Sequence, residues 1–190
     1  MVKNLNFLII LLLFASSVDL NAQHKDKWFR VNYLGFKIGY RKWSVNFIEV
    51  AYGDLSNGLG IGGTLFEIEN STYNLLPAKL FIAKPLGNTT GPVENGFGGP
   101  LLFPWGYQYP GAIYLQIKIS VLGIKQSSWC LSSEVGLGFE KSIYQQAGSI
   151  GVEFGYTIDF LPLRDEEDKY LYAVFQYNFS SWARVEKNSR

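Results

Sequence analysis

The stretch SIGVEFGYTIDF, residues 149–160, alternates between two kinds of side chain. Its even positions, from Ile150 to Phe160, are apolar or aromatic, and its odd positions, from Ser149 to Asp159, are small or polar. A period of two produces two distinct faces only in an extended strand, because a helix would mix the two sets. At about 3.3 Å per residue, such a strand is long enough to cross a bilayer at a tilt.

The rest of the chain repeats this alternation, with turn-forming residues between the alternating segments. The predicted strands are residues 28–40, 43–53, 59–69, 73–84, 112–123, 128–141, 149–160 and 170–179. The apolar phase flips at Arg41-Lys42, which predicts a tight turn there. Pro77 lies inside the fourth segment and removes one donor from its ladder. The pattern predicts an all-β fold, an antiparallel up-and-down β-barrel of about eight strands.

The first residues have the features of a secretory signal. Lys3 supplies a positive flank, residues 7–14 form an unbroken apolar core, and Ala22 precedes a cleavage position at Gln23. The apolar core is too short for a membrane helix, which needs about 20 residues. We therefore predict a signal peptide at 1–22, a polar lead at 23–27, a single barrel domain at 28–180 and a tail at 181–190.

Charge and cysteine content exclude several classes of protein. The 190 residues carry a net charge of +1, and no basic cluster with interleaved aromatic residues is present, so nucleic acid is not a predicted partner. The lone Cys130 cannot form an internal disulfide and is interpreted as structural.

The polar face of the strands indicates which side of the barrel faces outward. In the four late strands Gly and Ser dominate this face and charges are sparse, which suits a narrow lumen better than an exposed soluble surface. The apolar face of the same strands holds no charge and only one polar residue, Ser133. Since Lys or Arg facing mid-bilayer costs about 2 to 4 kcal/mol, this composition predicts that the apolar face points outward to lipid.

The pattern over residues 28–179 resembles the OmpA/OmpX type of small eight-stranded outer-membrane barrel. Its most specific feature is the last strand, where Tyr177 and Phe179 are similar to the alternating aromatic ending that barrel-assembly machinery recognises. The resemblance implies a location in the cell outer membrane and contact with its lipid. Eleven residues follow Phe179, however, whereas the last strand commonly closes the chain in that family.

A long connection at residues 85–111 also departs from the family. With both termini periplasmic it falls on the side that normally has short turns. It contains either a further strand or a segment folded up as a plug. Because a long loop is usually functional or disordered, we regard its aromatic residues as candidates for contact with an envelope partner: Phe103, Trp105, Tyr107 and Tyr109.

Charged residues on the predicted lumen face are the other candidate site: Lys37, Lys118, Glu134, Glu153 and Asp159. Buried charges must pair, so these residues predict a structural salt-bridge network in a closed barrel. A selective pore or a ligand site is the alternative interpretation.

Catalysis is not predicted. The only histidine is His24, in the polar lead, so a strand-borne base for a serine nucleophile is missing. No metal or cofactor motif is present. The predicted function is a noncatalytic outer-membrane protein with a structural or envelope-interaction role. The alternatives are a secreted lipocalin-like lipid carrier, a small pore and a lipid-modifying enzyme.

Overall fold

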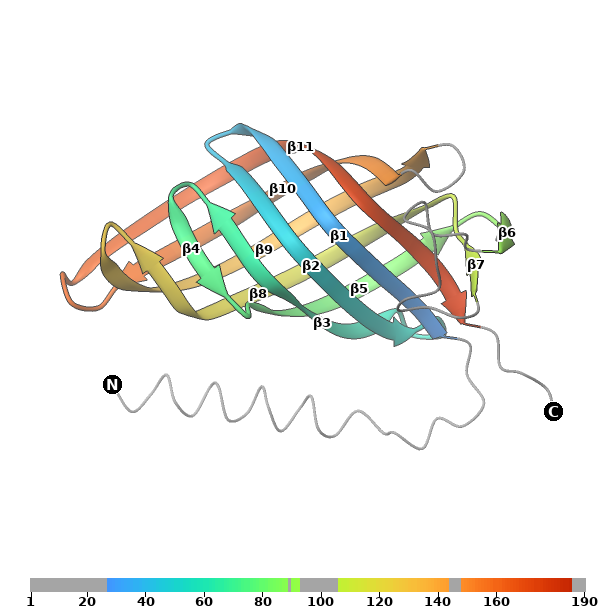
Figure 1. Ribbon diagram of the computed structural model, residues 1–190, viewed down its shortest axis with the longest axis horizontal. Helices are drawn as coiled ribbons and strands as arrows, with labels where there is room; N and C mark the ends of the chain where they lie inside the picture. Colours follow the sequence, from blue (N-terminus) through green and yellow to red (C-terminus); the bar gives the residue numbers. More distant parts are fainter. Residues whose placement is uncertain (1–26, 89, 93–105, 144–147, 186–190) are drawn as a thin grey trace.

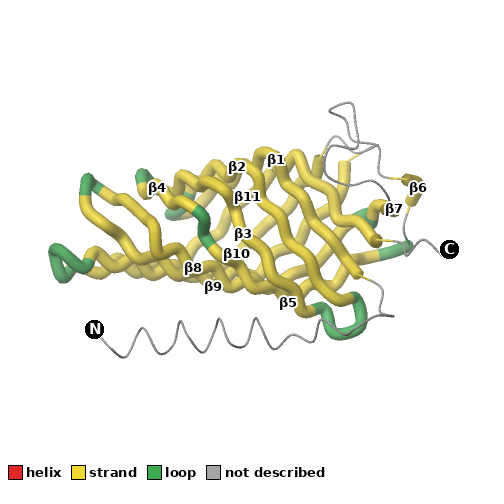
Figure 2. The backbone as a smooth tube through the Cα atoms, turned by 60° about the horizontal axis from the view of Figure 1, so that its bottom comes forward, coloured by secondary structure: helices red, strands yellow, loops and turns green. Residues whose placement is uncertain are grey.

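The computed structural model describes residues 27–88, 90–92, 106–143 and 148–185, and their regular elements are all strands. The strands form one antiparallel sheet that closes on itself into a barrel (Figures 1 and 2). Closure occurs where β1 (Lys27–Tyr40) pairs with β11 (Glu166–Val185). Over this described part of the chain, no helix is long and apolar enough to cross a membrane.

Eight long strands build the wall in chain order. Between β1 and β11 the wall contains β2 (Trp43–Asp54), β3 (Leu59–Glu69), β4 (Thr72–Leu75) continued by β5 (Ala78–Leu86), β8 (Gly111–Lys125), β9 (Ser128–Ile143) and β10 (Gly148–Leu161). Because β4 and β5 both lie between β3 and β8, they are two parts of one wall strand. The predicted fold class, an eight-stranded up-and-down barrel, is confirmed.

The fourth wall strand is interrupted where the sequence predicted a continuous one. Leu76 has a φ of 51°, and Pro77 has no amide hydrogen to donate. The neighbouring β3 accommodates the break, since Thr64 donates its amide to the Pro77 carbonyl at 3.0 Å and Leu76 donates to the Leu65 carbonyl at 3.0 Å. The wall therefore stays closed across the interruption.

The first strand changes face within its own length. The β1–β11 register shifts between Asn32 and Gly35. Lumen-facing side chains therefore occupy even positions before the shift, as at Arg30, and odd positions after it, as at Lys37. The turn predicted at Arg41-Lys42 is present, with Arg41 at a φ of 58°. The sequence signalled the turn but not the bulge.

The two ends of the barrel differ. Tight turns join β1 to β2, β3 to β4, β8 to β9 and β10 to β11 at one end, the tight-turn end. The start of β1, the end of β11, the end of β5 and the start of β8 lie at the other, the termini end (Figure 1). The long connection thus leaves and rejoins the barrel at the same end as the barrel's first and last strand residues, as the strand count predicted.

Two short strands occupy the described parts of that connection. β6 (Thr90–Pro92) pairs with β7 (Gly106–Gln108), and β7 pairs with Ala183 to Val185 of β11, beyond the start of β10. Neither is a ninth wall strand, and residues 93–105 lie outside the described residues. The last strand runs to Val185, six residues beyond its predicted end at Phe179, because β1 and β7 provide partners for that extension.

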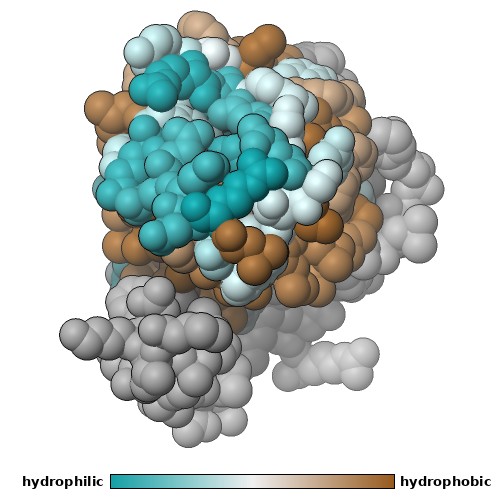
Figure 3. Space-filling view, turned by 90° about the vertical axis from the view of Figure 1, so that its left-hand side faces the viewer, coloured by the Kyte–Doolittle hydropathy of each residue, from teal (hydrophilic) through white to brown (hydrophobic). Residues whose placement is uncertain are grey.

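The faces of β10 follow its sequence alternation. Glu153 and Thr157 are fully buried inside the barrel, whereas Ile150 and Phe154 are 50% and 58% exposed on its outer wall. Figure 3 looks onto the tight-turn end and shows hydrophilic residues gathered over this end, with hydrophobic residues around its sides. The barrel therefore presents its apolar face outward, as the sequence predicted.

Candidate functional site: the charged lumen

Four of the five predicted lumen residues lie together in the middle of the barrel. Lys37 of β1 contacts Glu153 of β10 at 2.7 Å, and Lys118 of β8 contacts Glu134 of β9 at 2.8 Å. The Tyr172 hydroxyl lies between the two carboxylates, 2.7 Å from Glu134 and 2.8 Å from Glu153. A hydroxyl carries one proton, so Tyr172 donates to one carboxylate at a time and links the two ion pairs.

The fifth predicted residue, Asp159, lies apart from this centre. It pairs with Lys125 at 2.7 Å and accepts a hydrogen bond from Ser132. Lys125 also contacts the exposed Asp168 at 3.2 Å. Asp159 therefore joins a smaller ion-pair cluster near the tight-turn end.

Seven further charged residues extend the central network. All are buried inside the barrel: Arg30, Lys42, Glu49, Glu67, Glu69, Lys79 and Glu140. Together with Lys37, Lys118, Glu134 and Glu153 they form a nearly balanced set of five cations and six carboxylates.

The ion pairs run along the lumen through several strands. Arg30 contacts Glu140 at 2.6 Å and also pairs with Glu49, which pairs in turn with Lys79. Nearer the tight-turn end, Lys42 contacts Glu69 at 3.2 Å and also pairs with Glu134. Each buried cation of this network is thus paired with at least one carboxylate, as burial requires.

Some of these residues had a signal in the sequence. Glu67 and Glu69 alternate with Phe66 and Ile68, and Glu140 shares the phase of Glu134. Arg30 had no simple signal, because the bulge in β1 reverses the phase. Lys42 belongs to a turn by sequence, yet its side chain turns into the lumen.

An aromatic layer lies at the termini end of the lumen. Trp28 packs on Trp182 at a ring-centroid distance of 5.2 Å and on Phe81 at 6.1 Å, and Tyr114 stacks on Trp182 at 5.9 Å. The Trp182 indole donates to Glu140 at 2.8 Å, which joins the layer to the charged network. Bulky buried rings therefore fill the barrel at this end.

Glycine makes room for the layer. A Cβ atom built on Gly60 would lie 2.3 Å from the Trp28 ring. Gly60 thus allows the Trp28 ring to approach the backbone of β3 closely.

The aromatic residues of the long connection that were predicted to contact a partner lie in different places. Tyr109 is buried and belongs to the aromatic layer, so it packs on the barrel itself. Tyr107 lies in β7, whereas Phe103 and Trp105 fall outside the described residues.

The described charged side chains of the lumen are paired with one another. Within the described ranges no group of three His, Cys, Asp or Glu side chains is placed to hold a metal ion, and Cys130 is a buried free thiol. His24 lies outside the described residues.

Comparison of the chain with protein-family models, curated proteins and solved structures finds no match.

Proposed function

We propose that this chain is a noncatalytic, nonconducting β-barrel of the outer membrane, with a structural or interaction role in the cell envelope. The observation that carries the proposal is the distribution of side chains, apolar outside and charged inside. Large apolar residues are exposed around the whole wall, including Ile38, Ile82, Leu137 and Phe175. Such a continuous apolar surface on a monomer marks contact with a membrane or with other protein.

The height of the apolar wall supports lipid as its environment. On β9 the outward side chains from Trp129 to Phe139 are apolar except Ser133. Ten residue steps of about 3.3 Å at a tilt of about 40° span about 25 Å, the height of the apolar band on outer-membrane barrels. Lys141 follows at the termini-side edge of this band.

The filled lumen favours a closed barrel over the other predicted functions. A lipid carrier needs an apolar cavity, whereas this interior is lined by paired charges such as Lys37 and Glu153. A pore needs an open passage, whereas the charged side chains of the network are nearly inaccessible to solvent. Eight strands leave an interior just wide enough for side chains to fill.

Detergent refolding and conductance measurements test this proposal. We expect the mature chain to need detergent for solubility, to migrate differently on gels before and after boiling, and to show a β-type far-UV spectrum. In planar bilayers it is expected to produce no discrete conductance steps, because ion pairs and aromatic rings fill the lumen.

Three results would contradict the proposal. A folded, monodisperse protein in detergent-free buffer would indicate a soluble carrier, regular conductance steps would indicate a pore, and hydrolysis or acyl transfer on membrane lipid would indicate an enzyme. The boiled sample is the control for gel migration, and an empty bilayer is the control for conductance.

A further inference from the structure

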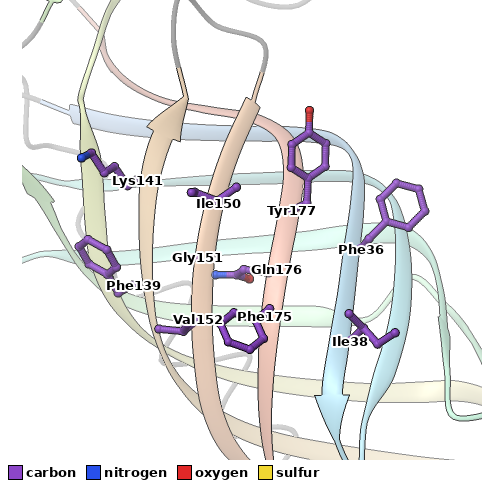
Figure 4. Close-up of a pocket in the computed structure, with 10 residues that line it drawn as sticks. All are labelled: Phe36, Ile38, Phe139, Lys141, Ile150, Gly151, Val152, Phe175, Gln176 and Tyr177. Atoms are coloured by element: carbon purple, nitrogen blue, oxygen red, sulfur yellow. The ribbon is translucent and has the colours of Figure 1, made fainter.

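We propose that a groove on the outer wall binds an anionic phospholipid, with an acyl chain in the groove and the phosphate at Lys141. The inference rests on the proposed membrane location and goes beyond it by assigning a particular lipid site. The groove has a volume of about 540 Å³ and crosses the outer faces of β9, β10, β11 and β1 (Figure 4).

The shape of the groove follows from side-chain size. Phe139 of β9 and Phe175 of β11 project on either side of β10, where the smaller, half-buried Val152 lies between them. In register, Val152 is paired with both phenylalanines, so the two rings flank it directly. Large rings beside a smaller residue leave an apolar channel of the kind that a hydrocarbon chain fills by dispersion contacts.

The charge at the edge of the groove identifies the lipid class. Lys141 is the only charged side chain among the groove's lining residues. It is exposed, and among the described residues it forms no ion pair with a carboxylate. Its neighbour Glu140 points the other way, into the lumen, where it pairs with Arg30. An ammonium at the margin of an apolar wall is well placed to meet a lipid phosphate.

Tyr177 adds a polar group at the same level. Figure 4 shows its hydroxyl directed along the barrel toward the end where Lys141 lies. Tyrosine favours the interface between hydrocarbon and headgroups, because its ring is apolar and its hydroxyl is polar. Lys141 and Tyr177 therefore border the headgroup end of a groove whose remaining wall is largely apolar.

Native mass spectrometry of the detergent-refolded full chain tests the site. The protein is titrated with dioleoylphosphatidylglycerol or dioleoylphosphatidylcholine, and the first lipid adduct is quantified. One such lysine contact is expected to favour the anionic lipid about fivefold. Lys141→Gln should remove this preference without preventing folding, because the side chain is exposed.

Lys84→Gln is the matched control. Lys84 is exposed on β5 near the same end of the barrel and does not line the groove, so this variant should keep the preference. A second variant, Val152→Phe, should weaken binding of both lipids by filling the groove. Inorganic phosphate should not displace the bound lipid, because it lacks the chain.

Equal binding of the two lipids by the unaltered protein would overturn the inference, as would a preference that survives Lys141→Gln. Displacement by inorganic phosphate would also overturn it. Gel migration before and after boiling is measured on every sample. A folded barrel without a lysine-dependent preference contradicts the lipid site alone, whereas a chain that folds without detergent contradicts the proposed function.

Discussion

Phe154→Arg is expected to destabilise the folded barrel by about 2 to 4 kcal/mol, because it would place a charge against hydrocarbon near mid-bilayer. Phe154 lies in the middle of β10, with its side chain 58% exposed on the outer wall. Urea unfolding in lipid vesicles, followed by the difference in gel migration before and after boiling, measures the loss.

Thr157→Ser is the control on the same strand. Thr157 faces the lumen, and the change removes one methyl group and keeps the hydroxyl, so we expect a much smaller loss of stability. In a water-soluble barrel, Phe154→Arg is expected to have little effect, since a substitution at an exposed position usually changes stability by no more than about 0.5 kcal/mol. A folded and equally stable Phe154→Arg variant would therefore show that this wall does not face lipid.

Glu153→Gln is expected to cost about 3 to 5 kcal/mol, because it leaves a buried ammonium without its counter-ion. Glu153 is fully buried and makes the ion pair of Lys37, at 2.7 Å. It also accepts hydrogen bonds from Tyr114 and Tyr172, both at 2.8 Å. The same unfolding measurement applies.

Removing the orphaned charge should recover much of this loss. In the double variant Lys37→Met with Glu153→Gln, neither charge remains. The free energy of unfolding of the double variant, compared with those of the two single variants, measures the coupling between Lys37 and Glu153. Glu167→Gln is the control, since its ion pair with Lys169 is exposed and exposed pairs contribute little. A Glu153→Gln variant with an unchanged free energy of unfolding would indicate that water reaches the lumen. That result would contradict a closed network.

The alternation of side chains was sufficient to predict the fold class and the faces of the late strands. In β10 the strand's own sequence predicts which side chains face the lumen and which face outward. Each odd residue from Ser149 to Asp159 is small or charged, and each even one is apolar. Pairing in an up-and-down barrel follows chain order, so the strand sequence also predicted the neighbours. The lumen location of Glu153 followed from the same alternation.

The remaining features of the strands and of the lumen network depend on contacts between distant parts of the chain, which a local sequence pattern does not contain. The bulge in β1 moves Arg30 into the lumen, and the break at Pro77 is tolerated because β3 supplies the bonding partners. The Lys42 side chain enters the lumen from a turn and pairs with Glu69 and Glu134, which are far from it along the chain. Such contacts depend on barrel closure, which no single segment encodes.

A spin-label scan of residues 150–160 tests the central claim, that the apolar outer wall contacts lipid and the charged face lines a closed lumen. Single cysteines are introduced after Cys130→Ser and labelled in the folded barrel in vesicles. Labels at the outward positions Ile150, Phe154 and Tyr156 should collide with oxygen, which partitions into lipid, and be shielded from a water-soluble nickel chelate. Outward labels fully accessible to the nickel chelate, in a chain that folds without lipid, would contradict the account.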